Sequence, residues 1–430
     1  METDDKKGCA FVENLIINGG CKLSGEIDIQ GAKNSALPIL AATVLIKGEC
    51  IIHNCPSLTD IDAAIKILEY LGCSVTKDGH TVCVNASGMS KSDIPETLMH
   101  EMRSSIIFLA PILARCNEAE LYTPGGCEIG VRPIDLHLYA LRKMGVEITE
   151  EHGKLICKCE KGLKGENINL SFPSVGATEN IIIAASLAKG TTVITNAARE
   201  PEIIDLADFL NSCGAEIKGA GESTVVITGK KNLCGCEHTV IPDRIMEATY
   251  LSAAAITGGS IELNNADATL ISSVIPLFEL SGCKIRYDDS RISISSPERL
   301  SGISTVRTMP YPGFPTDAQA PVMAMSTLAN STSVFVENIF ESRFKHVSEL
   351  CVMGAKIKVE GRVAIVEGVK KLSGANVKAP DLRGGAALVI AALAAEGETK
   401  ISDIYHIDRG CENFEENLRR LGAVISRKEI

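Results

Sequence analysis

The sequence predicts an α/β protein built from six copies of one unit of about 70 residues. A glycine recurs at positions 72, 145, 214, 282, 354 and 422. Each glycine has a large apolar residue four positions before it and a β-branched residue three positions after it. Apolar residues three and four apart mark one face of a helix, and glycine is the usual left-handed residue at a helix end. We therefore expect a helix that stops at each glycine and a strand after it.

A second predicted helix in each unit is rich in Ala, Ser and Gly. We expect these helices at residues 35–46, 104–113, 177–188, 245–256, 318–328 and 384–395. Their small side chains let other elements approach closely, so the helices should be buried. The strands that follow them end at Asn54, Thr123, Asn196, Asn264, Asn338 and Asp403. Each unit is thus of βαβαβ type. Because one unit cannot bury both helices alone, we expect two closed domains of three units each.

Composition excludes several classes of protein. The chain has 430 residues, a net charge of −11, 4% aromatic residues and no Trp, which argues against a nucleic-acid binder. The longest apolar run, residues 36–46, is about half of the roughly 20 residues that a membrane span needs. The first seven residues begin acidic and carry no signal-peptide core. We expect a cytoplasmic protein with no membrane or nucleic-acid partner.

The sixteen cysteines do not form a metal-binding pattern. No Cys-x-x-Cys occurs, and the two Cys-x-Cys pairs, Cys157/Cys159 and Cys234/Cys236, lack four-ligand zinc spacing. Although His238 stands beside the second pair, we expect no metal. The cysteines are interpreted as reduced thiols that act as small apolar residues.

Charged residues recur at equivalent positions of the units. Counting back 20 or 21 residues from the strand ends leads to Lys33, Arg103, Val175 beside Ser174, Asp243, Asp317 and Arg383. All of these positions lie at helix N-termini, where free N–H groups bind anions. A second set, Arg132, Arg343 and Arg409, precedes the other helices, with Glu200 and Glu202 at a related level. This pattern indicates a small polyanionic substrate, with ordinary solvated loop charges as the alternative.

One loop differs from the rest of the chain. Residues 123–133 contain three Gly and two Pro around Cys127. Such composition is typical of an exposed, mobile loop. The thiol of Cys127, five residues before Arg132, could act as a general acid or a nucleophile, or be an incidental surface cysteine.

Nine motifs, in order and at family spacing, give the chain a recognisable signature. They are Gly31-Ala-Lys-Asn34, Pro124-Gly-Gly-Cys127, Arg132-Pro-Ile-Asp-Leu-His137, Ser174-Val-Gly-Ala-Thr178, Ala198-Arg-Glu-Pro-Glu202, Phe314-Pro-Thr-Asp317, Phe340-Glu-Ser-Arg-Phe344, Asp381-Leu-Arg383 and Tyr405-His-Ile-Asp-Arg-Gly410. From about Leu15 to its C-terminus the chain resembles the UDP-N-acetylglucosamine 1-carboxyvinyltransferase family of the EPSP synthase superfamily.

The resemblance implies an architecture. The family has two similar domains, each an inside-out α/β barrel of three units, with the active site in the cleft between them. The N-terminal segment joins the C-terminal domain, so the expected domains are 33–241 and 1–32 with 242–430. The first domain carries the Cys127 loop as a lid.

The resemblance also implies the reaction: the enolpyruvyl group of phosphoenolpyruvate moves to the 3′-hydroxyl of UDP-N-acetylglucosamine and phosphate leaves. This is the first committed step of peptidoglycan precursor synthesis. It needs no cofactor or metal, and protein partners stay open. Cys127 is the implied acid, a possible site of a phosphoenolpyruvate adduct and the residue that fosfomycin attacks.

The site residues are carried over by motif. Catalysis is assigned to Cys127, Asp317 and Lys33. Phosphoenolpyruvate is assigned to Lys33, Asn34, Arg132, Arg343 and Arg409. UDP-N-acetylglucosamine is assigned to Asn34, Arg103, Arg132, Pro133, Ile134, Asp135, Leu136, Ser174, Val175, Asp317 and Ile339. The sequence departs from the family at Ser342 and Cys411, which affects the expected affinity rather than the expected reaction.

Two alternatives stay open. One is a superfamily member that transfers the same group to shikimate 3-phosphate, which lacks the Pro-Gly-Gly-Cys loop. The other is a non-catalytic, UDP-sugar-binding or regulatory paralogue. The presence of Lys33, Cys127, Asp317 and Arg409 argues against it.

Overall fold

The computed structural model describes residues 13–123 and 134–429, apart from the Arg103 side chain. In these residues the strands form six four-stranded sheets. Each sheet has the same order of pairing, with one parallel pair followed by two antiparallel pairs. The predicted α/β class with six repeated units is confirmed. Each sheet also holds a fourth strand. In five units a hairpin rather than a single strand follows the helix-stop glycine; in the sixth, one strand follows Gly422 and the N-terminal segment supplies its antiparallel neighbour.

The first three sheets are built from residues 49–239. They comprise β14 (Glu237–Thr239), β3 (Glu49–His53), β5 (Thr81–Asn85) and β4 (Ser74–Asp78); β6 (Asp93–Ile94), β7 (Glu118–Tyr122), β9 (Lys154–Lys158) and β8 (Glu147–Glu151); and β10 (Asn167–Asn169), β11 (Thr191–Thr195), β13 (Thr224–Thr228) and β12 (Glu216–Lys218). Among these twelve strands β14 comes last in sequence, but it pairs with β3 of the first unit, so the third unit closes onto the first.

The other three sheets combine the two ends of the described chain. They comprise β2 (Ser24–Asp28), β15 (Ser260–Asn264), β17 (Arg291–Ser295) and β16 (Lys284–Tyr287); β18 (Thr305–Arg307), β19 (Thr332–Val336), β21 (Val363–Glu367) and β20 (Lys356–Glu360); and β22 (Asn376–Lys378), β23 (Glu398–Ser402), β1 (Glu13–Asn18) and β24 (Val424–Glu429). Thus β1 and β2 complete sheets whose other strands come after residue 259.

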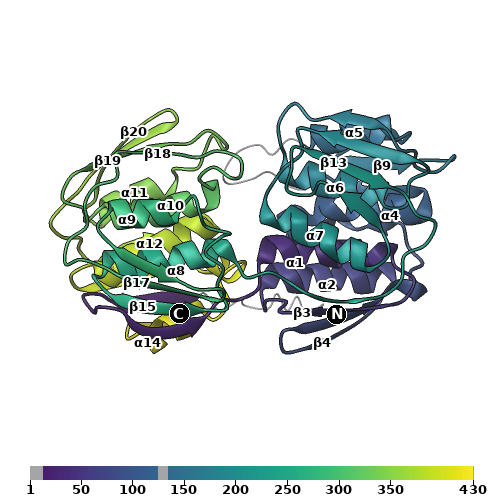
Figure 1. Cartoon of the computed structure of the whole chain (residues 1–430). Helices are drawn as coiled ribbons and strands as arrows, with labels where there is room; N and C mark the ends of the chain where they lie inside the picture. The colour runs from purple at the N-terminus through teal and green to yellow at the C-terminus, as the bar shows by residue number, and fades with distance from the viewer. Residues whose placement is uncertain (1–12, 124–133, 430) are drawn as a thin grey trace, which may run out of the picture.

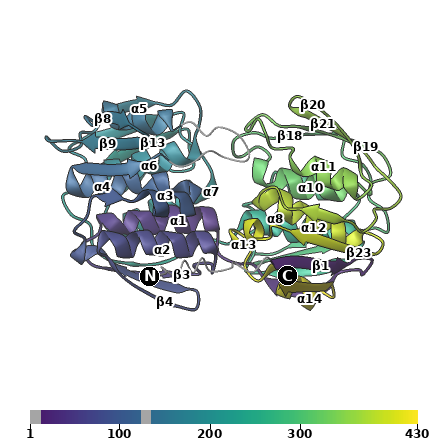
Figure 2. The same ribbon diagram turned by 180° about the vertical axis from the view of Figure 1, so that it is seen from behind.

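The small-residue helices lie inside, between the sheets (Figures 1 and 2). They are α1 (Lys33–Ala42), α4 (Leu109–Cys116), α6 (Val175–Ala185), α8 (Arg244–Ile256), α10 (Gln319–Ser326) and α12 (Leu382–Ala394). All 13 residues of α8 are buried, as the small-residue pattern predicts. The helix expected at 104–113 begins instead as the 3-10 segment η3 (Arg103–Phe108) and continues as α4.

The helices of the second series end at the repeated glycines. They are α2 (Thr59–Leu71), α5 (Asp135–Lys143), α7 (Pro201–Ser212), α9 (Ile275–Leu280), α11 (His346–Val352) and α14 (Phe414–Arg420). The six glycines have φ angles between 92° and 98°, which is the left-handed conformation expected of them. Smaller elements are α3 (Glu96–Glu101), α13 (Tyr405–Asp408), η1 (Thr43–Leu45), η2 (Ala86–Gly88) and η4 (Thr316–Ala318).

The recurring Asn at strand ends has a structural cause. Asn54 and Asn196 follow β3 and β11 with positive φ, and each side-chain amide donates to a backbone carbonyl 2.8 Å away. In the fourth unit β15 ends at Asn264 as predicted, and the next residue, Asn265, has the positive φ and the same kind of side-chain hydrogen bond. Asn tolerates the left-handed conformation and satisfies a neighbouring carbonyl, which favours it at this turn.

Buried apolar side chains form two separate clusters. One runs from Ala32 to Val240, and the other combines residues 15–29 with residues 246–425. On this basis we propose 33–241 and 1–32 with 242–430 as the two domains. In the described residues, no helix is both long and apolar enough to cross a membrane.

Two chain segments connect the clusters and run side by side. Ala32 N donates to Ile241 O at 2.8 Å, and Asp243 N donates to Gln30 O at 2.9 Å. A Cβ atom on Gly31 would lie 1.7 Å from the Asn54 carbonyl oxygen, so only glycine fits there. This crossing leads directly into α1, which begins with the predicted site residues Lys33 and Asn34, and into α8, which Asp243 caps.

Candidate active site

Lys33 and Arg409 meet at a buried carboxylate that the sequence did not single out. The Asp60 side chain, in the first turn of α2, is 2% exposed and lies 3.2 Å from Lys33 Nζ. Arg409, which follows α13, donates to the same carboxylate from Nε at 2.9 Å and from Nη2 at 3.2 Å. Asp60 and Arg409 are 349 residues apart, and they lie in chain segments that contribute to different apolar clusters. The structure therefore brings two of the predicted phosphoenolpyruvate ligands together around one acid.

The charges of this group are strongly coupled. Burial alone would raise the pKa of Asp60, but Lys33 and Arg409 outweigh it and hold that pKa below its usual value. Burial lowers the pKa of Lys33, and the nearby Arg383 and Arg409 cations lower it further, against the opposing effect of Asp60. Asp60 thus compensates a concentration of positive charge that would otherwise be costly to bury.

A second acid, Asp317, lies between two arginines. Its Oδ1 accepts from Arg343 Nη2 at 2.6 Å and its Oδ2 accepts from Arg383 Nη2 at 3.0 Å. Arg343 also donates to the Thr316 carbonyl oxygen at 3.1 Å. Both arginine side chains are nearly buried, whereas the Asp317 side chain is 25% exposed. Asp317 lies within η4, while the capping positions of η4 and α10 are occupied by Pro315 and Ala318. Asp317 is therefore not the N-cap residue of either helix.

Asp243 connects the chain crossing to these charged residues. Its Oδ1 caps α8 by accepting from Ile245 N and Met246 N, and its Oδ2 accepts from Lys33 N at 3.3 Å. Burial lowers the pKa of Arg383, but Asp317 and Asp243 outweigh it and raise that pKa. Asp243 thus orients Lys33 and also raises the pKa of Arg383.

Cys411, where the sequence departs from the family pattern, is buried beside the same charges. Burial raises the pKa of its thiol to about 12, although Arg383 and Lys33 act in the opposite direction. Cys411 is therefore a neutral thiol at neutral pH.

A third charged group joins the two clusters near the start of α7. Arg244 forms a bidentate pair with Glu202, at 2.9 and 3.2 Å, and Tyr311 N donates to Glu200 at 3.4 Å. Burial, followed by the charges of Glu202 and Glu200, raises the pKa of Glu179 to about 8. The sequence analysis identified Glu200 and Glu202, which lie near the repeat position that holds arginines in other units. It did not indicate Arg244 or Glu179.

The residues assigned to the UDP-sugar are spread over several element ends. Ser174 is the N-cap of α6 and accepts from Ala177 N at 3.4 Å, and Val175 begins that helix. Ile339 follows β19 and donates its N–H to Glu337 at 2.8 Å. Asp135 begins α5, with Ile134 before it and Leu136 after it. Asn34 is half-buried beside Lys33.

Part of the predicted site lies outside the described residues. Cys127, Arg132 and Pro133 fall there, and so does the proposed lid. For Arg103 only the backbone, at the start of η3, is described. In the described ranges no group of three or more His, Cys, Asp or Glu could hold a metal ion.

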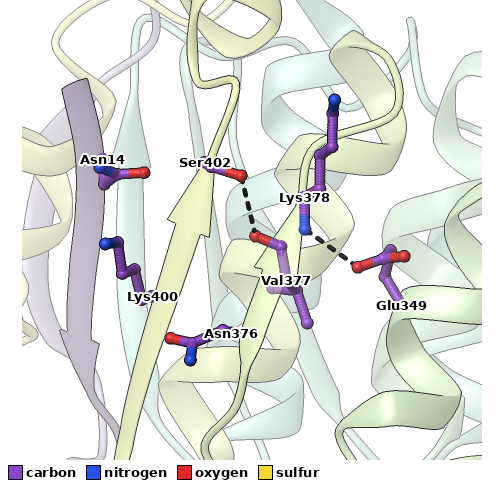
Figure 3. Close-up of a pocket in the computed structure, with 7 residues that line it drawn as sticks. All are labelled: Asn14, Glu349, Asn376, Val377, Lys378, Lys400 and Ser402. Atoms are coloured by element: carbon purple, nitrogen blue, oxygen red, sulfur yellow. Dashed lines mark hydrogen bonds between the residues drawn. The ribbon is translucent and has the colours of Figure 1, made fainter. Parts of the chain in front are cut away.

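A cavity in the described part of the chain lies away from these charged groups. It measures about 430 Å³ and is lined by Asn14, Glu349, Asn376, Val377, Lys378, Lys400 and Ser402 (Figure 3). These residues come from β1, α11, β22 and β23, and no predicted site residue is among them. The charged groups between the two clusters, rather than this cavity, carry the case for an active site.

Replacing Asp60 with Ala is expected to lower the free energy of unfolding by about 3–5 kcal/mol, because it leaves Lys33 and Arg409 unpaired in a buried place. Asp62→Ala on the same helix is the matched control. Its carboxylate pairs with Lys77 at 2.9 Å but is 53% exposed, so the expected loss is about 0–1 kcal/mol. Urea unfolding of both variants tests this difference. Equal losses would show that Asp60 does not hold the cations.

His137 should make stability dependent on pH. The ring is buried, its Nδ1 lies 2.6 Å from Asn180 Nδ2, and burial lowers its pKa to about 4. Between pH 6.5 and 4 the unfolded chain binds a proton that the folded one does not, so stability falls as pH falls. His137→Asn should remove about 2 kcal/mol of the loss between pH 7.5 and pH 5. Urea unfolding at both pH values measures it. The control is His152→Asn, at an exposed site, which should retain the wild-type loss.

The chain is similar to known proteins over nearly its whole length. The family model for EPSP synthase (3-phosphoshikimate 1-carboxyvinyltransferase) matches residues 17–418. UDP-N-acetylglucosamine 1-carboxyvinyltransferase 2 of Caldanaerobacter subterraneus subsp. tengcongensis is 51% identical over 96% of this chain and 98% of its own. UDP-N-acetylglucosamine 1-carboxyvinyltransferase 1 of Symbiobacterium thermophilum is 49% identical over 96% of this chain and 95% of its own.

Solved structures support the fold. The enolpyruvyl transferase NikO from Streptomyces tendae has a TM-score of 0.88 at 23% identity, covering 98% of this chain and all of its own. An EPSP synthase from Acinetobacter baumannii has a TM-score of 0.75 at 19% identity, covering 97% and 100%. Taken with the near full-length identity to the carboxyvinyltransferases, these matches show that the chain belongs to the UDP-N-acetylglucosamine 1-carboxyvinyltransferase family.

Proposed function

We propose that this chain is a transferase that moves the enolpyruvyl group of phosphoenolpyruvate to the 3′-hydroxyl of UDP-N-acetylglucosamine, with release of phosphate. The near full-length identity of 51% to a protein of that name carries the proposal. The reaction is the first committed step of peptidoglycan precursor synthesis, and we place it in the cytoplasm. It serves cell-wall growth, cell shape and division, and makes the chain a fosfomycin target.

The cations between the two clusters suit phosphoenolpyruvate. The substrate carries about three negative charges, and arginine forks bind phosphate and carboxylate well. Lys33, Arg409 and Arg343, with Asn34 beside them and Arg132 on the predicted lid, form the proposed binding set. Arg409 uses Nε and Nη2 on Asp60, and its Nη1 makes no hydrogen bond to another described residue. Asp60 would thus hold the guanidinium in place while leaving a donor for the substrate.

The sugar nucleotide is proposed to bind between the same two domains. Arg103, Arg132, Pro133, Ile134, Asp135 and Leu136 from one domain, with Ser174 and Val175 near the uridine, would face Asp317 and Ile339 from the other. Because Asp317 comes from the second domain and Lys33 from the first, both domains must contribute to one reaction centre.

The proposed chemistry is addition followed by elimination. Asp317 accepts the proton of the sugar hydroxyl as its oxygen attacks C2 of phosphoenolpyruvate, and Cys127 gives a proton to the methylene carbon. The tetrahedral intermediate then loses phosphate and one proton of the new methyl group, which restores the double bond. Both oxygens of Asp317 accept from arginines, but a carboxylate has further lone pairs and can still receive the hydroxyl proton.

Phosphate release with defined substrates tests the proposal. We expect turnover only when phosphoenolpyruvate and UDP-N-acetylglucosamine are both present. Turnover with shikimate 3-phosphate instead would favour the rival superfamily activity. Binding of the UDP-sugar without phosphate release would favour the non-catalytic paralogue.

A further inference from the structure

Three cysteine side chains lie close together near the C-terminal end of α7, and none of them belongs to the proposed reaction centre. Cys213, the first residue after α7, places its Sγ 3.1 Å from Sγ of Cys236. Cys50, in β3, lies near Cys213, and the two thiols act on each other's pKa, which is lowered for Cys50 and raised for Cys213. Cys213 and Cys50 are buried, whereas Cys236 is half-buried and Cys234 is exposed. The sequence indicated only the Cys234/Cys236 spacing, and the tertiary fold brings in the other two thiols.

Backbone hydrogen bonds hold the segments around Cys213 and Cys236 together. Cys234 N donates to the Cys213 carbonyl oxygen at 2.9 Å, and Ile51 N donates to the Cys236 carbonyl oxygen at 3.0 Å. Cys213 lies just beyond a helix end and Cys236 just before β14, so neither is inside a regular element. A disulfide has an S–S distance of about 2.0 Å, so the two sulfur atoms need to approach by about 1 Å. Element ends can absorb such a shift.

A metal does not explain the cluster. In the described ranges no set of His, Cys, Asp or Glu is arranged to hold one. The nearby His238 is engaged elsewhere, since its Nε2 lies 2.8 Å from Asp205 Oδ1. Thiols in contact, with one of them reachable from solvent, are instead suited to disulfide exchange.

We propose that Cys213 and Cys236 form a reversible thiol–disulfide site that is oxidised by a low-molecular-weight disulfide. The thiolate of Cys236 attacks one sulfur of the small disulfide and expels the other as a thiolate, forming a mixed disulfide. The deprotonated thiol of Cys213 then attacks the Cys236 sulfur and expels the second small thiolate. One disulfide forms in the protein, and the small disulfide is reduced to two thiolates, which take up the two protons that the cysteines lost.

The exposure of the two cysteines indicates which of them attacks the small disulfide first. Cys236 reacts first because it is the more exposed member of the pair. Burial raises the pKa of the Cys236 thiol, with the hydrogen bond from Cys213 acting against it. Because the thiolate is the reactive form, exchange should be slow at pH 7 and faster at pH 8.5.

The bond would connect two parts of the first domain. Residues 234–241 lead from the thiols to the crossing, where Ile241 accepts the hydrogen bond of Ala32, directly before Lys33. A disulfide would therefore tie the C-terminal end of α7 to the segment that supports the start of α1. Neither cysteine has a place in the proposed catalytic machinery.

Peptide mapping of the full chain tests the proposal. The native protein is incubated at pH 8.5 with hydroxyethyl disulfide, its remaining thiols are alkylated under denaturing conditions, and the digest is analysed by mass spectrometry. We expect one cross-linked pair of peptides joining Cys213 to Cys236, about 2 Da lighter than the two reduced peptides together and lost on adding dithiothreitol. The rate of linkage should be higher than at pH 7.

The control variants separate this pair from its neighbours. Cys213→Ser and Cys236→Ser should both abolish the link, whereas Cys50→Ser and Cys234→Ser should retain it. A link between Cys50 and Cys213 would overturn the proposal. So would a wild-type chain in which Cys234 and Cys351, both exposed, are modified while Cys213 and Cys236 stay as thiols. The mapping of the wild-type chain decides the question even if a variant fails to fold.

Discussion

Asp317→Asn is expected to lower kcat by a factor of about 10²–10⁴, which is the usual worth of a general base. The amide retains an oxygen and the size of the side chain, so Arg343 and Arg383 keep part of their contacts while the basic group is lost. If Asp317 acts only by placing the two arginines, KM for phosphoenolpyruvate should rise and kcat should change little. The separate effects on kcat and KM, measured by phosphate release, distinguish the two roles.

Asp288→Asn is the matched control for this experiment. Its carboxylate also binds an arginine, Arg291 at 2.7 Å, but both side chains are about half-exposed. We expect wild-type kinetics from that variant. Near-normal kcat in a folded Asp317→Asn chain would contradict the assignment of Asp317 as the base.

Cys127→Ala is expected to reduce turnover by a similar factor of about 10²–10⁴, because it removes the proposed proton donor. Cys127→Asp should retain turnover with a changed pH profile, since a carboxylic acid can also give a proton to the methylene carbon. A free cysteine has a pKa near 8.5, so about 3% is thiolate at pH 7. The thiol is thus available as an acid, while the minor thiolate makes the residue reactive.

The same variants test how that reactivity relates to catalysis. A thiol-alkylating epoxide should inactivate the wild-type chain and leave Cys127→Asp active. If Cys127→Asp were as inactive as Cys127→Ala and still bound UDP-N-acetylglucosamine, the acid role would be wrong and an obligatory covalent role would replace it. Cys351→Ala, at an exposed site away from the proposed centre, is the control and should behave as wild type.

Much of the charged site could be predicted because its residues occupy equivalent positions in the repeated units. Lys33, Asp243, Asp317 and Arg383 occupy equivalent helix entrances, and the structure brings their charges close together. Asp60 could not be predicted in the same way. Acidic residues are common in the first turn of a helix, where they offset its dipole, so nothing in the sequence distinguishes Asp60 from Asp62.

The repeated units, their buried small-residue helices and the glycine that ends each helix could all be predicted from local sequence patterns. These features depend on local spacing and on the conformational freedom of single residues, which adjacent positions in the chain reveal. The three-dimensional structure alone decided that Asp60 binds Arg409 from 349 positions away and that Cys213 touches Cys236 rather than another thiol. Such contacts depend on how the two clusters and the closing strand β14 are packed, and no local pattern in the chain encodes that geometry.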